Sequence, residues 1–288
     1  MFKQRVITAL LLAPLALAAV FFLPLSGFAV FISVAFLLGA WEWSGFCGLP
    51  SKTARWVYVG LTAAIFALLY WQLPVQVSWP VETNVLLTSL LLAGNAWWLL
   101  AIVLVLSYPR SQKLWAKSDW GKALMGWLTL IPAWAAVMFI RSTDYAASTF
   151  TGAWLICCLL LLVWAADIGG YIVGKPFGKH KLLPKVSPGK TIEGMLGGLT
   201  FVMLFVTAVA ATMQWPEGVL YWYLAALLLT LLSVFGDLSE SMFKRVAGLK
   251  DSGAARVTAC VPFLAYGRKD RRTKERDPVT LRYVAQLV

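Results

Sequence analysis

The chain has 288 residues, of which 60% are hydrophobic and only 13% are charged, and its mean hydropathy is +0.75. A soluble domain carries about 25% charged residues, so the composition excludes a soluble globular protein and predicts an all-α polytopic integral membrane protein. The formal net charge is +12. No soluble domain is present to hold a basic face against a duplex, so the charge predicts cytoplasmic loops and no nucleic-acid partner.

Eight apolar runs are long enough to cross a bilayer, which takes about 17–25 helical residues. The first follows Lys3 and Arg5 as in a signal peptide, but no small-residue cleavage site precedes the next run, so we expect an uncleaved helix. In chain order the runs are Val6–Leu23, Phe28–Phe46, Trp56–Leu73, Leu87–Leu106, Leu124–Ile140, Ala153–Val173, Met195–Met213 and Val219–Phe235. We divide the chain into residues 1–150 with helices one to five, 151–253 with helices six to eight and a basic loop, and a basic tail over 254–288.

The loops alternate between two compositions. Nearly every Lys and Arg lies in one set: Phe2–Arg5, Gly48–Arg55, Tyr108–Lys122, Lys175–Lys190 and the chain from Lys244 onward. Little charge lies in the other set: Leu23–Gly27, Pro74–Thr88, Arg141–Phe150 and Gln214–Gly218. Positively charged loops stay in the cytoplasm, so the sequence predicts a multi-pass membrane protein with its N-terminus and all basic loops on the cytoplasmic side.

One polar cluster follows the last apolar run, over Ser233–Gly253. If this segment is helical, the positions i, i+3, i+4 and i+7 share a face. Those positions are held by Asp237, Glu240, Ser241 and Lys244, with Arg245, Lys250 and Asp251 close behind. Ionisable groups at the end of a membrane segment are costly and are usually kept for a function, so we interpret this stripe as part of a site.

A second polar cluster runs from Trp164 to Gly194. Asp167 lies well inside the sixth apolar run, where a lone carboxylate is more often functional than structural, although a hydrogen bond to a neighbouring helix is the alternative. The loop after it offers cations, hydroxyls and flexible backbone amides, a combination that suits phosphate oxygens. Its candidate binding residues are Lys179, His180, Lys181, Lys185, Ser187, Lys190 and Thr191. The glycine spacing is not that of a Walker A loop.

Taken together, the two clusters pair carboxylates with lysines on the same predicted side of the membrane. Carboxylates bind a hard divalent cation such as Mg²⁺, and lysines neutralise phosphate. The sequence therefore predicts phosphorylated substrates, one of which is a lipid. His180 is the only histidine. It could act as a general base, but its position between two lysines favours a headgroup contact or a solvated loop residue.

These two stretches resemble the bacterial phosphatidate cytidylyltransferase family, also called CDP-diacylglycerol synthases. The family signature begins S-x-x-K-R, continues to K-D-x-G and ends with a His-Gly-Gly and an Asp-Arg-x-Asp segment. Its first half is matched by Ser241, Lys244, Arg245, Lys250, Asp251 and Gly253, and the preceding Gly236, Asp237, Leu238 and Glu240 match as well. The family's intramembrane Asp and Lys-rich loop match Asp167 through Glu193. The resemblance covers residues 1 to about 253.

The resemblance implies a reaction in phospholipid biosynthesis, in which CTP and phosphatidate give CDP-diacylglycerol and pyrophosphate. It implies Mg²⁺ as cofactor, with Asp237 as a ligand and with Asp167 and Glu240 as further candidates around the metal. Lys244, Arg245, Lys250 and the loop lysines would hold phosphates, and Ser241 would donate to a phosphate oxygen. The resemblance also implies a bacterial inner membrane, whose lipids are the expected surroundings. A homodimer is compatible with the sequence, which does not determine the oligomeric state.

After Gly253 the chain departs from this pattern. The family continues with the His-Gly-Gly segment, two further aspartates and a ninth apolar helix. Residues 254–288 contain no His and no Gly-Gly, and the apolar run Thr258–Tyr266 is too short to span. We hypothesise a frameshifted or otherwise altered C-terminus, with a divergent paralogue as the alternative, and expect strongly reduced activity.

Two other functions are left open. An inactive membrane homologue that binds lipid or partners is compatible with the altered C-terminus. A transporter of an anionic substrate would also use an intramembrane Asp and a basic vestibule, but repeated halves with broken helices are not visible in the sequence. The aspartate-rich signature of CDP-alcohol phosphotransferases is absent.

Overall fold

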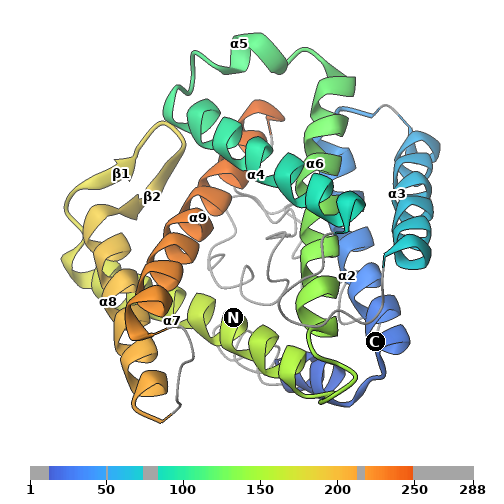
Figure 1. The fold of residues 1–288 in the computed structure, drawn as a ribbon. Coiled ribbons are helices and arrows are strands. Elements are labelled where there is room, and N and C mark those ends of the chain that lie inside the picture. Colours follow the sequence, from blue (N-terminus) through green and yellow to red (C-terminus); the bar gives the residue numbers. More distant parts are fainter. Residues whose placement is uncertain (1–12, 50, 74–83, 213–217, 249–288) are drawn as a thin grey trace. The chain divides into compact units, whose positions relative to one another are not determined.

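The computed structural model describes all residues except 1–12, 50, 74–83, 213–217 and 249–288 (Figure 1). Within this described part, seven helices are long and apolar enough to cross a membrane, which confirms the predicted helical membrane protein. They are α2 (Leu25–Phe46), α3 (Lys52–Gln72), α4 (Val85–Leu106), α6 (Asp119–Ser142), α7 (Thr151–Phe177), α8 (Ile192–Ala210) and α9 (Val219–Val246). The first predicted span falls partly outside the described residues, and its described part is helical over Ala13–Phe22.

Three shorter elements complete the described part: α5 (Gln112–Trp115) and the antiparallel strands β1 (Lys181–Leu183) and β2 (Ser187–Thr191). The chain divides into two compact units. One takes in the chain up to Leu100, Lys113–Ile156 and the stretch from Phe243, and the other comprises Ala101–Gln112 and Cys157–Met242.

In the first unit, α2 packs against α3 and α6. Aromatic side chains fill the space between them. The rings of Phe66 and Trp134 are stacked with centroids 4.9 Å apart, and the Trp134 indole N–H donates to Ser33 Oγ at 2.9 Å. Trp134 is only 1% exposed. A buried indole needs such a hydrogen-bond partner, and Ser33 supplies it for Trp134.

Arg141 is a buried charged residue at the C-terminal end of α6. It was assigned to an extracytoplasmic loop from the sequence, but it lies in the last turn of α6 and is 1% exposed. Its guanidinium donates to the carbonyl oxygens of Val20 at 2.9 Å, Leu23 at 3.2 Å and Thr149 at 3.0 Å. The planar donor fork of Arg suits several acceptors at once, so one side chain ties the end of the first helix to the α6–α7 connection.

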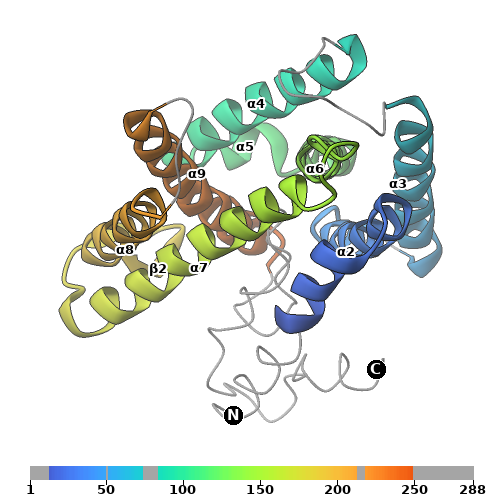
Figure 2. The same ribbon diagram turned by 60° about the horizontal axis from the view of Figure 1, so that its bottom comes forward.

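In the second unit, α7 and α8 cross at glycines. A Cβ atom on Gly169 would lie 2.5 Å from the Gly197 carbonyl oxygen, and one on Gly197 would lie 2.4 Å from Val173 Cβ. Gly174 and Gly194 meet in the same way one turn along, at 3.0 Å. Small residues let helix backbones approach closely inside a bilayer, where packing rather than hydrophobic exclusion drives association. Figure 2 shows α7 and α8 with the strands that connect them.

Adding a methyl group at this crossing should therefore destabilise the protein. We expect Gly197→Ala to cost about 1–3 kcal/mol, because the backbones must separate to admit it. Gly60→Ala on α3 is the matched control, since nothing lies within 4 Å of its position. Thermal unfolding in detergent, monitored by the exposure of buried thiols, measures both. Equal melting temperatures for the two variants would contradict the tight crossing.

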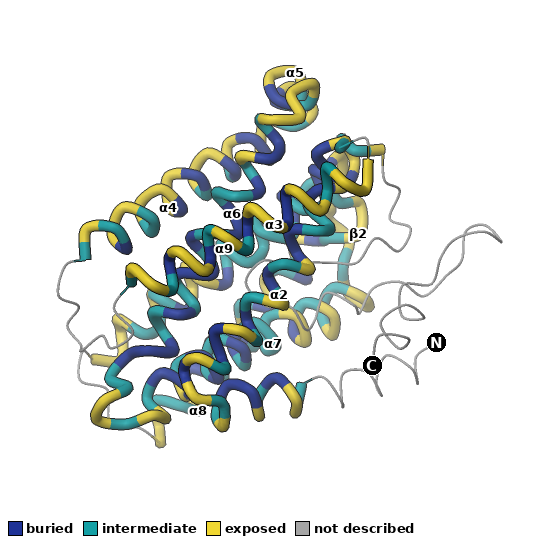
Figure 3. The backbone as a smooth tube through the Cα atoms, turned by 90° about the vertical axis from the view of Figure 1, so that its right-hand side faces the viewer, coloured by how far each residue is buried: buried dark blue, intermediate teal, exposed yellow. Residues whose placement is uncertain are grey.

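Large apolar side chains remain exposed along the spans. Examples are Phe22 at 81%, Trp71 at 88% and Leu220 at 70%, and Figure 3 shows exposed and buried stretches alternating along the helices. Such surface is unfavourable in water but suits acyl chains. The exposed apolar surface agrees with the membrane environment predicted from composition.

Cys47 caps the C-terminus of α2 just outside the apolar span and is fully buried, at 0% exposure. Burial raises the pKa of its thiol from 9.0 to about 12, opposed in part by Lys122. The thiolate is the reactive form, and at pH 8 a rise of three units lowers its fraction about a thousandfold. We expect negligible maleimide labelling of Cys47 at pH 8 in the folded protein and rapid labelling in SDS, scored by peptide mass spectrometry. Rapid labelling before unfolding would contradict the buried position.

Candidate active site

The basic loop predicted between helices six and seven of the sequence folds as a β-hairpin. β1 and β2 pair antiparallel, with Lys181 opposite Thr191 and Leu183 opposite Ser187. At the turn between them the Val186 N–H donates to the Leu183 carbonyl at 3.0 Å, across Pro184 and Lys185. Sequence periodicity gave no signal for strands this short. Proline, by fixing the backbone at the turn, is the feature that could have suggested a hairpin.

Thr191 links the hairpin to α8. Its backbone is extended, and its Oγ1 accepts a hydrogen bond from the Gly194 N–H at 3.1 Å, the usual role of a Thr at a helix N-cap. The cap ends β2 and starts the helix within one residue. Thr191 is 7% exposed. Its hydroxyl therefore caps the helix N-terminus, and its predicted role as a substrate ligand stays a prediction.

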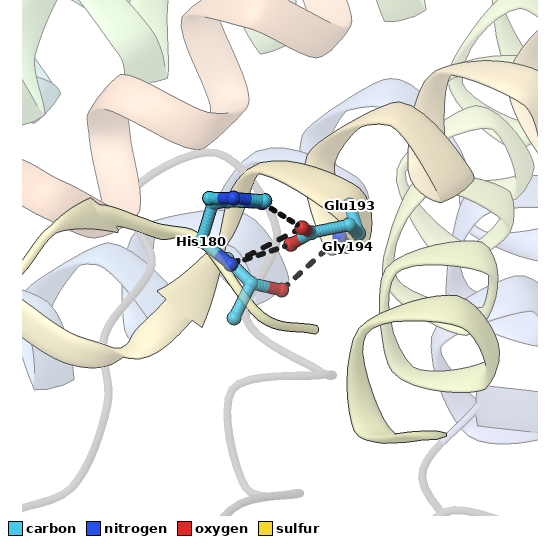
Figure 4. Close-up of polar contacts among 4 residues, drawn as sticks. His180, Glu193 and Gly194 are labelled. Carbon is cyan, nitrogen blue, oxygen red and sulfur yellow. Dashed lines mark hydrogen bonds and ion pairs between the residues drawn. The ribbon is translucent and has the colours of Figure 1, made fainter. Parts of the chain in front are cut away.

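His180 and Glu193 close the base of the hairpin (Figure 4). The His180 backbone N–H donates to both carboxylate oxygens of Glu193, at 3.1 and 3.2 Å, and the imidazole Nδ1 lies 2.6 Å from Oε1. The Ile192 N–H also donates to the His180 carbonyl at 2.9 Å. The sequence suggested no partner for Glu193. The structure gives it one, and it makes His180 part of the clamp that holds the hairpin against the first turn of α8.

The hairpin carries the lysines predicted to contact phosphate. Lys179, Lys181 and Lys185 are exposed, whereas Lys190 is largely covered. Ser187 begins β2 and is partly buried. These exposed lysines form a cationic surface on the hairpin, which suits an anionic ligand rather than an apolar one.

Lys190 brings the two sequence clusters together. Its Nζ lies 2.8 Å from Asp237 Oδ2, joining β2 to α9 across 47 positions of the sequence. The lysine side chain is 13% exposed and the aspartate side chain 38%. A charge-assisted bond that is partly withdrawn from solvent is stronger than a surface ion pair. One residue from each of the two sequence clusters therefore takes part in this contact.

The segment around Asp237 is helical, as the spacing predicted. α9 runs to Val246 and carries Asp237, Glu240, Ser241 and Lys244 along one stripe. Asp237, Glu240 and Ser241 are half-buried and Lys244 is buried, whereas Arg245 is exposed. Lys250 and Asp251 lie outside the described residues, so their predicted roles stay predictions.

An aromatic cluster holds the end of α9 in the first unit. The Phe243 ring lies 4.8 Å from Trp43 and 4.9 Å from Trp115, measured between centroids. Phe46 stacks on it at 6.3 Å. All of these except Trp43 are 6% exposed or less. The sequence gave no reason to connect these four rings. Their packing fixes the helical turn that carries Lys244 and Arg245.

Asp167 lies in the body of α7 with an exposed side chain. Within the described residues, no three His, Cys, Asp or Glu side chains come close enough together to hold a metal ion. Mg²⁺ is usually bound through one or two carboxylates with substrate phosphates and waters completing the shell. The half-exposed Asp237 carboxylate fits that mode of binding, in which the substrate supplies most of the ligands. The metal roles of Asp167 and Glu240 stay predictions.

Comparison with known proteins decides the family. The model of the cytidylyltransferase family matches residues 3–255. The chain belongs to the cytidylyltransferase family. A protein of Pseudomonas aeruginosa named phosphatidate cytidylyltransferase is 42% identical over 253 residues, covering 88% of this chain and 87% of that protein. The protein of the same name from Haemophilus influenzae is 37% identical over 292 residues, covering 92% and 98%.

A more distant relative with that name, from Bacillus subtilis, is 33% identical over 160 residues. No solved structure matches the chain. Membership of the cytidylyltransferase family makes the chain a nucleotidyltransferase by descent, as the sequence motifs predicted. The membrane spans, the basic hairpin and the Asp237 helix all lie within the matched residues.

The last part of the chain gives a different match. Residues 237–288 are similar to the N-terminal domain of ribose phosphate pyrophosphokinase. A frameshifted or otherwise altered C-terminus, with a divergent paralogue as the alternative, stays a hypothesis. The cytidylyltransferase match ends at residue 255, so the two matches share residues 237–255.

Proposed function

We propose that the cytidylyltransferase segment transfers the cytidylyl group of CTP to phosphatidate at the cytoplasmic face of a bacterial inner membrane. The products are CDP-diacylglycerol and pyrophosphate. The observation that carries the proposal is the Lys190–Asp237 contact of 2.8 Å, because it joins the phosphate-binding loop to the carboxylate helix. The names of the relatives support the choice of substrates.

In this reaction an oxygen of the phosphatidate phosphate attacks the α-phosphorus of CTP. The bond from that phosphorus to the bridging oxygen breaks in line, and pyrophosphate leaves. Such transfers depend mainly on positioning and on neutralising charge on the phosphate oxygens. We assign that work to the lysines of the hairpin and to the basic end of α9. A phosphate monoester dianion needs little help from a general base, which agrees with the use of the only histidine in the hairpin clamp.

Mg²⁺ bound at Asp237 would neutralise charge that develops on the triphosphate. Asp237 would hold it through a carboxylate oxygen, while Glu240 and Asp167 would act around it. Ser241 lies one turn of α9 beyond Asp237, where its hydroxyl could donate to a phosphate oxygen. We assign Lys250 and Asp251 to the same site because they match the K-D-x-G part of the family signature.

The proposed orientation of the protein in the membrane follows from the distribution of Lys and Arg. The hairpin and the end of α9 both carry clustered Lys and Arg, and such segments stay on the cytoplasmic side of a bacterial membrane. CTP is a soluble cytoplasmic nucleotide, so the proposed site faces the compartment that contains CTP. The same rule places the N-terminus in the cytoplasm. An inactive homologue is the second candidate function, favoured by the dissimilar stretch after residue 255.

The test follows label from CTP into lipid. Membranes containing the chain are incubated with phosphatidate and CTP labelled on the α-phosphate, and with CTP labelled on the γ-phosphate in parallel. We expect label to enter the lipid only from the α-position, at a low rate for the unaltered chain and at a high rate when residues 254–288 are exchanged for the segment of a relative. A transporter would instead carry intact nucleotide into sealed vesicles. Lipid labelling from neither substrate in either protein would contradict the proposal.

A further inference from the structure

Lys190 and Asp237 form an ion pair whose two members have different access to solvent. The ammonium is the more enclosed, at 13% exposure, and the carboxylate faces outward at 38%. Lys190 reaches α9 from β2, which the hairpin and its clamp hold in place. The lysine is therefore supplied by the hairpin, and the Asp237 side chain is the more exposed member of the pair.

A divalent cation at Asp237 would meet this ammonium. Mg²⁺ binds a carboxylate oxygen at about 2.0–2.1 Å, and Lys190 Nζ is already 2.8 Å from Oδ2. Two cations on one carboxylate would lie only a few ångströms apart and repel each other strongly where water is partly excluded. A bare metal ion must therefore displace the lysine, whereas a metal that arrives with a polyphosphate brings anionic oxygens to which the lysine can move.

We propose that Lys190 is an exchangeable counter-ion of Asp237. It neutralises the carboxylate while the site holds no nucleotide, and it transfers to a phosphate oxygen when a metal–nucleotide complex binds. The ammonium keeps its proton, and no covalent bond changes. This inference rests on the proposed function, because it takes Asp237 as a metal ligand and a nucleoside triphosphate as the incoming anion. The site then discriminates against free divalent cations and in favour of the complex.

The proposal predicts effects of opposite sign from one substitution. Lys190→Gln removes the competing charge, so Asp237 should bind a free divalent ion about tenfold more tightly, as expected when a charge within about 4–6 Å is removed. The same variant should bind CTP more weakly, because it loses a phosphate contact. A residue that only stabilised the fold would change both affinities in the same direction. Lys190→Arg keeps the charge and should leave metal affinity close to that of the unaltered chain.

The experiment uses the full chain purified in detergent, with Mn²⁺ as the metal probe and no nucleotide present. Free Mn²⁺ is followed by electron paramagnetic resonance. We expect tighter binding by Lys190→Gln and loss of that binding in the double variant with Asp237→Asn. Lys175→Gln is the matched control, because it removes the same charge from α7, where Nζ contacts Tyr171 Oη at 2.8 Å. Its Mn²⁺ affinity should be unchanged.

The outcomes of this experiment distinguish the counter-ion role of Lys190 from the proposed cytidylyltransferase function. Unchanged or weaker Mn²⁺ binding by Lys190→Gln overturns the counter-ion role and leaves the proposed function standing. Tighter Mn²⁺ binding with no measurable CTP binding by any variant supports the carboxylate–lysine competition but contradicts the proposed function. If none of the proteins binds Mn²⁺, the metal assignment of Asp237 is wrong, and the counter-ion role is overturned with it.

Discussion

Exchanging residues 254–288 for the C-terminal segment of the Pseudomonas aeruginosa relative should raise CDP-diacylglycerol formation about 10²–10³-fold, the scale of restoring one electrostatic element of an active site. The family pattern continues after Gly253 with a His-Gly-Gly and an Asp-Arg-x-Asp segment, which the resemblance assigns to the second half of the site. Residues 254–288 contain neither. The rate is measured as label from α-labelled CTP in extracted lipid.

The control for this exchange carries the same segment with both of its aspartates changed to Asn. It should stay near the low rate of the unaltered chain, because segment length and hydrophobicity are kept while the carboxylates are lost. High activity of the unexchanged chain would show that the missing half is dispensable. Sequencing the coding DNA around residue 253 tests separately whether one gene encodes both parts.

Asp237→Asn should abolish most of the activity of the exchanged protein, with a loss of about 10²–10³-fold. Asn keeps the size of the side chain but cannot supply the anionic oxygen that a hard cation requires. It also removes the partner of the Lys190 ammonium. The decrease should appear in kcat and persist at saturating CTP, because charge on the transferring phosphoryl group develops after binding.

Asp144→Asn is the matched control for that substitution. Asp144 lies in the α6–α7 connection with a φ of 53°, a conformation that Asn tolerates, so the fold should not change. We expect activity within about twofold of the parent, since surface substitutions are usually close to neutral. If Asp237→Asn were equally harmless, Asp237 would not be the metal ligand.

The sequence predicted the spans well because each is a continuous apolar run, but it misplaced their ends. α3 begins at Lys52 and α6 at Asp119, several residues before the predicted Trp56 and Leu124. In both cases a polar first turn follows a serine N-cap, Ser51 or Ser118. Hydrophobicity alone does not include such turns, whereas the capping pattern does.

The arrangement of the candidate site residues was predicted in part. The residue types and the helical stripe through Asp237 followed from spacing within one segment. The contacts of that stripe with other elements could not be predicted from spacing, because the Lys190–Asp237 contact and the Phe243 cluster join elements that are distant in the sequence. The hairpin was also missed: strands of three and five residues are too short for a periodic signal, and their stability comes from the clamp at Glu193.

The position of Asp237 along α9 has a consequence for how the two substrates meet. Asp237 precedes the end of the helix at Val246 by nine residues, or about 14 Å at the α-helical rise. On the proposed topology, with Val246 on the cytoplasmic side, we expect the carboxylate to lie closer to the membrane interior than the end of the helix does. The water-soluble nucleotide would then travel inward to the reaction plane. The diacyl substrate would arrive sideways, without leaving its leaflet.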